Sequence, residues 1–502
     1  MTFPSFDFDS IVSALPVVYD RLRVDGAIVY TADPGRPVIH GGSLLVERSM
    51  IKAVGTSQEI DAIEASLGPS MGRTRRIDAR GKMLLPGLVD NHWHDSSALR
   101  ALQSLTKAPD DSDTEPSLMS HGGQPEKISM EFNGLFDVAK NLPPDVARAS
   151  AVYSYVTHLR AGTTCVADFG SLNHPDVLAQ AVLDTGIRGV VSVYSVDGEC
   201  RPEDSTFTRT RDTDELLGEI EGTLSRYRAH ASGRLRAMPS VLWSVNASDE
   251  LLTGAAALAN RFDTPWGSHV AAICKESATS QRYFGVRGAE RLHRLGLLSQ
   301  RLISAHTAFA DEDEFDWLVR SGVNLTYSAQ KYGISGESPL SGTKQILRFL
   351  KAGAPVCWSS DGDPSPVGHM PESMRMGWLA CNEMSADPST VTPMRALAMG
   401  TRLAAESLQW SHEIGSLSPG KKADFIMVSI EDWRYVGVRR PLNIFLSMGG
   451  SNDIDTVVVD GRILVEKGAL TFVDERALAA AFMEQSIALS EALGQGAARV
   501  PS

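Results

Sequence analysis

Two histidines one residue apart, His92 and His94, follow the apolar run 83–89. Side chains in an extended segment alternate between its two faces, so both imidazoles point the same way. Two neutral imidazoles on one side of a strand end form half of a site for zinc, iron or another first-row ion. A His-x-His pair alone also occurs by chance or at a solvated strand end, so the interpretation depends on further ligands along the chain.

Three further candidate ligands end later apolar runs. His269 and His306 each stand at the end of a run of strand length, and Asp361 follows the run 355–360. A single histidine in such a position is more often structural than a ligand. Two of them behind a His-x-His pair, with a carboxylate placed in the same way, favour a metal site because imidazole and carboxylate bind first-row ions.

These residues need a frame of strands that brings their ends together. Apolar strand candidates alternate with helix-like or loop segments, which predicts an α/β protein with parallel strands. Eight parallel strands joined by helices close into a barrel whose active site lies at their C-terminal ends, where the candidate ligands stand. The candidates are a run ending at His94 and the runs 163–168, 189–194, 237–243, 266–271, 302–306, 323–327 and 355–360.

The composition is that of an ordinary globular protein and excludes several classes of function. The chain has 502 residues, a formal charge of -13 and five scattered cysteines without Cys-x-x-Cys spacing. The charge argues against a nucleic acid or an anionic membrane as partner, and the cysteines against a disulfide framework or a thiolate zinc site. We find no signal peptide and no apolar run of membrane-spanning length, and we expect a cytoplasmic protein that acts on a small molecule.

The run from Leu84 to His94 resembles the Pro-Gly-hydrophobic-hydrophobic-Asp-x-His-x-His signature of the amidohydrolase superfamily. The resemblance implies a metal-dependent hydrolase: a (β/α)8 TIM-type barrel over 81–411, with a small β-sandwich domain formed by 1–80 and 412–475 and a C-terminal helix and tail over 476–502. Short alternating runs at both chain ends fit the sandwich strands. They are 22–29, 43–47, 51–54, 425–428, 456–459 and 462–465.

The resemblance also implies roles for the candidate ligands. His92, His94 and His269 would hold one divalent ion, zinc first and iron, manganese or cobalt as alternatives. Asp361 would ligate the ion and accept the proton of the attacking water, and His306 would hydrogen-bond that water or the substrate oxygen. Such an ion lowers the pKa of bound water from about 15.7 to near 7. The layout is similar to that of the deaminase and triazine-hydrolase branch, whose members often form homodimers or larger homo-oligomers.

Two positions depart from the family pattern. Deaminases of this kind carry a glutamate three residues after the fifth-strand histidine, where this chain has Ala272. Glu276, one helical turn further on, is the candidate replacement, against the alternative of a solvated helix residue. The fourth run, 237–243, contains no lysine that could bridge two ions, which favours a single metal.

Candidate substrate-binding residues follow from position alone. They stand at strand ends or in the loops after the first and second strands, and each could equally be a packing or surface residue: His121, His174, Trp243, Asn246, Tyr327 and Gln330. The long polar segment 107–124 is a candidate lid, since loops of that length in compact domains are often functional.

The pattern favours a hydrolase that cleaves a carbon–nitrogen bond in a small cyclic or heteroaromatic substrate, by deamination, alkylamine removal or hydrolysis of an amide or urea-like bond. Because Ala272 cannot protonate a ring nitrogen, we favour the last two reactions, in which the leaving group departs with little protonation of the ring. One alternative is displacement of halide or thiolate from a heteroaromatic ring. Another is a catalytically inactive metal-binding barrel, against which the complete His-His-His-His-Asp set argues.

Overall fold

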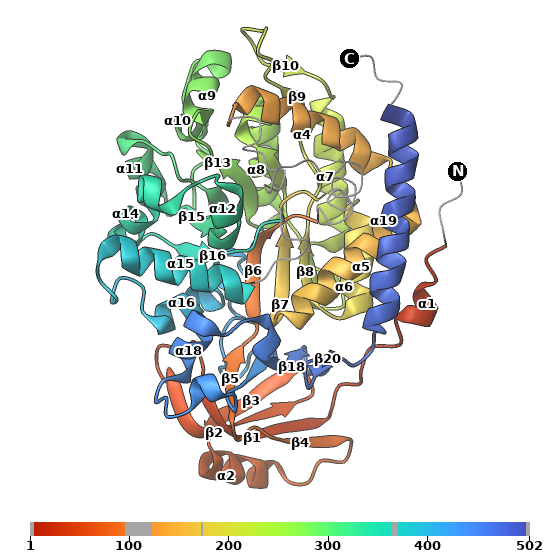
Figure 1. Cartoon of the computed structure of the whole chain (residues 1–502), viewed down its shortest axis with the longest axis vertical. Coiled ribbons are helices and arrows are strands. Elements are labelled where there is room, and N and C mark those ends of the chain that lie inside the picture. Colours follow the sequence, from red (N-terminus) through yellow and green to blue (C-terminus); the bar gives the residue numbers. More distant parts are fainter. Residues whose placement is uncertain (1–4, 96–122, 172–173, 363–369, 498–502) are drawn as a thin grey trace.

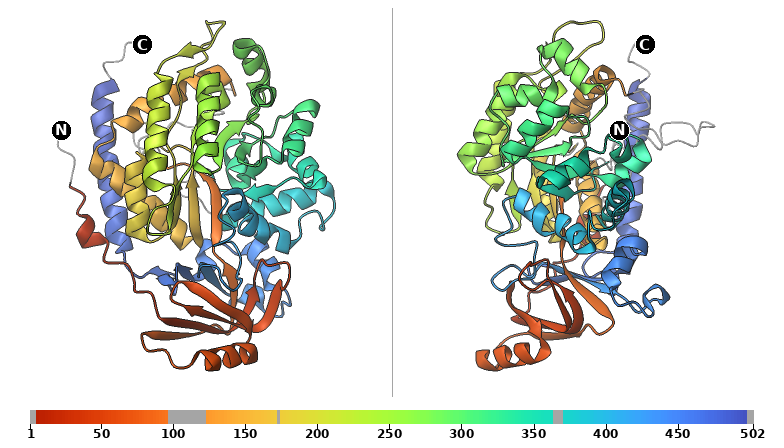
Figure 2. Two further views of the ribbon diagram at one scale, coloured as in Figure 1. Left: turned by 180° about the vertical axis from the view of Figure 1, so that it is seen from behind. Right: turned by 90° about the vertical axis from the view of Figure 1, so that its left-hand side faces the viewer.

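The computed structural model describes residues 5–95, 123–171, 174–362 and 370–497 (Figure 1). A mixed sheet occupies one end of the long axis, and parallel strands with helices outside them fill the rest (Figures 1 and 2). The last described helix is α19 (Glu475–Ala497), where Phe482 stacks on Tyr153 with ring centroids 4.4 Å apart. None of the described helices is long and apolar enough to span a membrane.

The mixed sheet combines strands from both chain ends, in the order β20-β19-β18-β17-β5-β1-β2-β3, with β4 beside β1. Its centre is the antiparallel pairing of β17 with β5, in which Phe425 faces Pro86. All six predicted terminal runs lie in this sheet. The strands are β1 (Arg21–Tyr30), β2 (Val38–Glu47), β3 (Met50–Thr56), β4 (Thr74–Asp78), β5 (Lys82–Pro86), β17 (Phe425–Ser429), β18 (Ile454–Val459), β19 (Arg462–Glu466) and β20 (Ala469–Leu470).

Two parallel sheets carry the remaining predicted strands, in the orders β11-β8-β7-β6 and β12-β13-β14-β15-β16. The fourth predicted run is divided between them, because Pro239 has no N–H to donate and separates β11 from β12. The strands are β6 (Leu88–Trp93), β7 (Thr163–Asp168), β8 (Arg188–Val191), β11 (Leu235–Ala237), β12 (Ser240–Trp243), β13 (Trp266–Val270), β14 (Leu302–His306), β15 (Asn324–Tyr327) and β16 (Val356–Trp358).

The third strand is shorter than its apolar run suggests. The run continues to Tyr194, but β8 ends at Val191. The N–H of Ser192 donates to Asp168 Oδ2 at 3.2 Å, and its hydroxyl donates to the same carboxylate. A buried carboxylate therefore takes the backbone donor that would otherwise continue the ladder.

Helices connect successive parallel strands and begin at residues suited to cap them. Ser248 accepts a hydrogen bond from Leu251 N at the start of α8, and Asp311 and Glu314 form a capping box at the start of α11. Most of these helices contribute buried residues to one large core cluster. The connecting helices include α5 (Pro144–Arg160), α6 (Pro175–Thr185), α7 (Thr213–Tyr227), α8 (Asp249–Phe262), α9 (Glu276–Phe284), α10 (Gly288–Arg294), α11 (Glu312–Ser321), α12 (Ala329–Ser335) and α14 (Gln345–Ala352), and α15 (Met370–Ser385) follows the last parallel strand.

Small apolar side chains from strands of both parallel sheets meet in one buried cluster, which includes Val89, Cys165, Ala167, Ile303, Ala305 and Cys357. Side chains two residues apart on a strand share a face, so this cluster fixes which residues point inward. The last strand also approaches the first, where the N–H of Asp361 donates to the carbonyl of His92 at 3.1 Å. The polar residues that follow these strands are thereby brought to one end of the sheets.

Candidate metal centre

Three imidazoles meet at the C-terminal ends of β6 and β13. His92 Nε2 lies 3.2 Å from His94 Nε2 and 3.0 Å from His269 Nε2, and the last two nitrogens are 3.2 Å apart. Nitrogens bound about 2.0–2.1 Å from a tetrahedral zinc ion lie roughly 3.3 Å from one another. The donor type and the spacing therefore fit one small divalent ion held by all three rings.

The outward nitrogens of two of these rings fix their tautomers. His94 Nδ1 lies 3.0 Å from the carbonyl of Gly170, and His269 Nδ1 contacts the carbonyl of Leu242. A carbonyl accepts only, so each Nδ1 carries the proton and each Nε2 presents a lone pair to the centre. Burial holds the pKa of His92 and His269 well below the usual value, so the rings are neutral, as ligands must be.

Asp361 and His306 stand beside the three rings. Asp361 Oδ1 lies 3.9 Å from His94 Nε2, and Oδ2 lies 3.5 Å from His306 Nε2. His306 shares a 2.6 Å hydrogen bond between its Nδ1 and the Tyr332 hydroxyl, which directs Nε2 towards the carboxylate. Both residues have a positive φ, 61° for Asp361 and 69° for His306, a strained backbone of the kind that persists where its surroundings enforce it.

Asp90 links the ends of the first and last strands. The N–H of Ser360 donates to its Oδ1 at 3.2 Å, and the Ser360 hydroxyl donates to its Oδ2. Burial raises the pKa of Asp90 to about 7. Asp90 belongs to the signature that precedes His92, and its position explains why a carboxylate stands there: it orients the backbone that carries both Asp361 and the His-x-His pair.

Lys331 and Glu337 also belong to this cluster, although the sequence offers no sign of it. Lys331 Nζ lies 3.0 Å from Asp361 Oδ2 and 3.2 Å from Glu337 Oε1, and both side chains are buried. A Glu337 oxygen lies within 4.8 Å of the ligand atoms of His306 and Asp361. In the sequence the lysine appears as a helix residue and the glutamate as a loop residue, with no spacing that connects either to Asp361.

Glu276 is buried rather than solvated, and its carboxylate is engaged by the backbone. It accepts hydrogen bonds from the N–H groups of Ala271 at 2.7 Å and Ala272 at 2.6 Å. Burial raises the pKa of Glu276 to about 7. These bonds hold the turn after β13 that follows His269, which is a structural role, while a catalytic role for Glu276 stays a prediction.

The candidate substrate-binding residues are placed less uniformly. Trp243 and Tyr327 are buried at the ends of β12 and β15, and Gln330 is half-buried on α12. Asn246 is buried, and its amide donates to the carbonyls of Ser129 and Gly198 at 2.9 Å, which ties it to backbone.

Two candidate substrate residues lie in loops. His174 caps α6 and lines a cavity of about 350 Å³ together with Tyr194 and Phe136. None of the metal-cluster residues lines that cavity. His121 and most of the candidate lid 107–124 lie outside the described residues, so both stay predictions.

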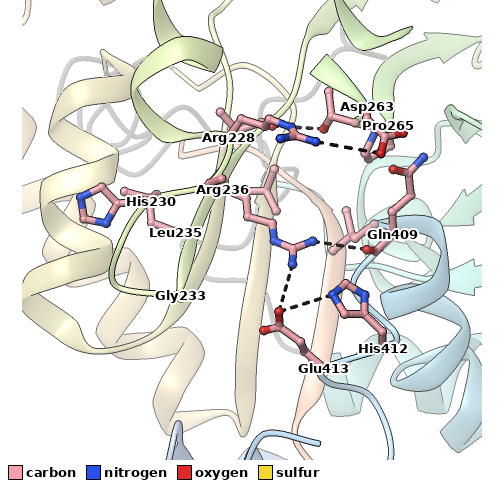
Figure 3. A pocket seen from close by; sticks show the side chains of 15 residues that line it. Arg228, His230, Gly233, Leu235, Arg236, Asp263, Pro265, Gln409, His412 and Glu413 are labelled. Carbon is pink, nitrogen blue, oxygen red and sulfur yellow. Dashed lines mark hydrogen bonds and ion pairs between the residues drawn. The ribbon is translucent and has the colours of Figure 1, made fainter. Parts of the chain in front are cut away.

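A second cavity, of about 360 Å³, lies at the opposite ends of the strands, where β11 begins and just before β13 (Figure 3). Its charged groups face one another: Arg236 Nη2 lies 3.5 Å from Glu413 Oε1, and Arg228 Nη2 lies 4.0 Å from Asp263 Oδ2. No predicted site residue lines it. The candidate centre is therefore the histidine cluster at the C-terminal strand ends.

Comparisons with known proteins identify the family of the chain. A profile of the Amidohydrolase family matches residues 83–464, more than half of the chain. The chain is 27% identical over 440 residues to a 5′-deoxyadenosine deaminase of Methanobrevibacter smithii, an alignment that covers 86% of this chain and 90% of that protein.

Solved structures share the fold. An adenosine deaminase from Xanthomonas campestris with bound zinc superposes with a TM-score of 0.78 at 20% identity, over 95% of this chain and 100% of that one. A triazine hydrolase variant superposes with a TM-score of 0.78 at 23% identity, over 93% and 99% of the two chains. At these identities the likeness extends to the fold alone.

Proposed function

The chain belongs to the Amidohydrolase family, and we propose that it is a hydrolase that cleaves a carbon–nitrogen bond in a small heteroaromatic substrate with one divalent ion, zinc. The observation that carries the proposal is the triangle of Nε2 atoms of His92, His94 and His269, 3.0–3.2 Å apart. Buried rings so close together repel one another when they are protonated. When they are neutral, their Nε2 lone pairs face one another without a hydrogen-bond donor. A bound cation is the arrangement that satisfies all three.

Asp361 has two roles in the proposed centre, as a metal ligand and beside the attacking water. When bound, the ion lowers the pKa of a coordinated water to near 7. Asp361 presents Oδ1 towards the histidine triangle and Oδ2 towards His306, so one carboxylate both completes the ligand set and can accept the proton of a water that His306 holds. Burial by itself raises the pKa of Asp361, but the ammonium of Lys331, 3.0 Å from Oδ2, holds it well below its usual value. Asp361 is thus anionic, as ligation requires.

His306 holds the attacking water or the substrate oxygen. Its Nδ1 is fixed by Tyr332, so Nε2 can face only the space next to Asp361. Burial lowers the pKa of His306 to about 3, so the ring is neutral before reaction. The neutral imidazole hydrogen-bonds the attacking water or the substrate oxygen, while Asp361 takes the water proton and passes it to the leaving nitrogen, which is the transfer that carbon–nitrogen hydrolysis needs.

The frame that holds this centre is, in our proposal, a closed eight-stranded (β/α)8 barrel over 81–411. The hydrogen bond from Asp361 N to His92 O, which joins the last strand to the first, supports closure. The sheet made by both chain ends would then be part of a small β-sandwich domain over 1–80 and 412–475, with 476–502 as helix and tail.

A second reaction remains a candidate because of Ala272, whose methyl group cannot protonate a ring or a departing amine. Displacement of chloride or thiolate from a heteroaromatic ring needs less protonation of the leaving group. The same attacking water and the same proton acceptor, Asp361, would serve it.

A substrate panel tests the proposal. Zinc-loaded protein is incubated with 5′-deoxyadenosine, adenosine, a chlorotriazine and a cyclic urea, and ammonia, amine, chloride and ring-opened product are measured. We expect release of ammonia or amine from at least one nitrogen heterocycle. Chloride release alone would favour the second reaction, and protein with one zinc per chain but no product from any compound would contradict both.

A further inference from the structure

The space next to Ala272 is enclosed by groups from other elements. Glu276 holds the backbone N–H of Ala272 from one side. From another side the Ser338 hydroxyl donates to the carbonyl of Ala272 at 2.6 Å. The loop between α12 and α13 (Leu340–Thr343) is therefore anchored directly on the turn where related deaminases carry their glutamate.

The residue before Ser338 in this loop, Glu337, lies near the metal centre. Ser338 has a φ of 44°, unusual for a residue other than glycine, and Gly336 has a φ of 75°. Between them Glu337 is only 3% exposed, and its carboxylate comes within 4.8 Å of the ligand atoms of His306 and Asp361. A buried carboxylate thus reaches the site from the β15 side while position 272 offers only a methyl group.

Lys331 fixes that carboxylate in place. Its ammonium lies between Glu337 Oε1, at 3.2 Å, and Asp361 Oδ2, at 3.0 Å, and the side chain is 9% exposed. One ammonium between two buried carboxylates offsets part of the cost of burying both charges. It also occupies the place between His306, Glu337 and Asp361 where a second cation could otherwise bind.

We propose that Glu337 is the substrate-facing carboxylate of this centre, in place of the one missing at position 272, and that Lys331 is the residue that positions it. The inference rests on the proposed function. An ionised carboxylate accepts hydrogen bonds only, so Glu337 selects substrates that present an N–H next to the reacting carbon, such as amino or alkylamino heterocycles. Rings that carry chloride there lack this donor.

Binding of a matched pair of nucleosides tests the role of Glu337. Affinity of the zinc-loaded protein for adenosine and for 6-chloropurine riboside is measured by rapid mixing under single-turnover conditions, which separate binding from chemistry, beside zinc content by mass spectrometry. We expect the Glu337→Gln protein to retain one zinc and to bind adenosine about 10- to 100-fold more weakly, the range for a hydrogen bond to a charged group. The chloropurine should change by less than about threefold, and Glu383→Gln, at an exposed glutamate on α15, should change neither.

Two further variants separate the role of Glu337 from a structural effect. In the Glu337→Gln background, Ala272→Glu should restore part of the preference for adenosine. With Glu337 in place, Lys331→Arg should keep more of that preference than Lys331→Met. Glu337→Gln protein with one zinc and an unchanged preference for adenosine would overturn the proposal. Wild-type protein that holds zinc but binds neither nucleoside would overturn the proposed substrate class, and this inference with it.

Discussion

The two ends of the parallel strands both gather polar and charged side chains, but they arrange them differently. At the N-terminal ends, the arginines labelled in Figure 3 face carboxylates: Arg236 pairs with Glu413, and Arg228 pairs with Asp263. Arg301, outside the cavity lining, also pairs with Asp263. At the C-terminal ends three neutral imidazoles turn their acceptors towards one another. The first arrangement is complete without a ligand, and the second becomes complete only with a cation. This difference is why we propose the functional centre at the C-terminal ends and a structural role for the cavity.

The largest effect is expected when a metal ligand is removed at the C-terminal ends of the strands. We expect His92→Ala to lower zinc content from about one ion per chain to near zero, because the variant lacks one of the three imidazole ligands and keeps only two imidazoles and a carboxylate. Hydrolysis should fall below detection with it. Mass spectrometry of the dialysed protein measures the loss, and circular dichroism checks that the fold is kept; a variant that still holds a full ion would refute the ligand assignment.

Removing the charge of Asp361 should have the next largest effect. Asp361→Asn keeps the size of the side chain but no longer accepts a proton, so kcat should fall about 10²- to 10⁴-fold, the usual range for general acid–base transfer. Lys331 also loses its 3.0 Å partner, so zinc affinity and stability need separate measurement. Unchanged kcat at full zinc occupancy would show that His306 alone handles the proton.

Glu276 gives a smaller effect that depends on pH. Burial raises the folded-state pKa of Glu276 to about 7 from 4.5, so the folded protein binds more protons than the unfolded chain between these values. Its contribution to stability is full below about pH 4.5 and is lost as the pH rises through 7. The glutamine variant does not titrate at this position.

We therefore expect the stability advantage of wild type over Glu276→Gln to shrink between pH 5 and pH 8 in denaturant titrations. The variant should be less stable throughout the acidic part of this range, because the amide replaces an acceptor of two backbone N–H groups. A difference in stability that does not change with pH would mean that Glu276 stays ionised in the fold. A large loss of kcat with intact stability would instead favour the catalytic role predicted from the sequence.

The smallest effect is expected at the other end of the strands. Arg236→Met removes a cation that lies 3.5 Å from Glu413 and packs over the Trp410 ring at 4.1 Å. Stability should fall by about 1 kcal/mol, the order of one partly exposed ion pair, with zinc content and kcat unchanged. Thermal melts and the panel assay measure both. Loss of zinc or activity in this variant would mean that the two ends are coupled.

Sequence patterns were sufficient to place the candidate ligands near strand ends, because apolar runs of strand length mark buried parallel strands and a polar residue close to the end of each run lies near the sheet edge. His92, His94, His269, His306 and Asp361 were identified in this way, and the structure brings them together. Lys331 and Glu337 could not be identified, since they reach the centre through the path of a helix and a loop that no periodicity encodes. The division of the fourth strand at Pro239 was visible only as a proline inside an apolar run.

The central claim is that His92, His94, His269 and Asp361 hold a single ion, and X-ray absorption at the zinc edge of the loaded protein tests it most directly. We predict nitrogen and oxygen neighbours about 2.0–2.2 Å from the metal, the outer-shell pattern of three imidazoles, and no sulfur. We also predict no second metal at about 3.5–4 Å. A metal–metal distance in that range, or a first shell with fewer than three imidazoles, would contradict the account.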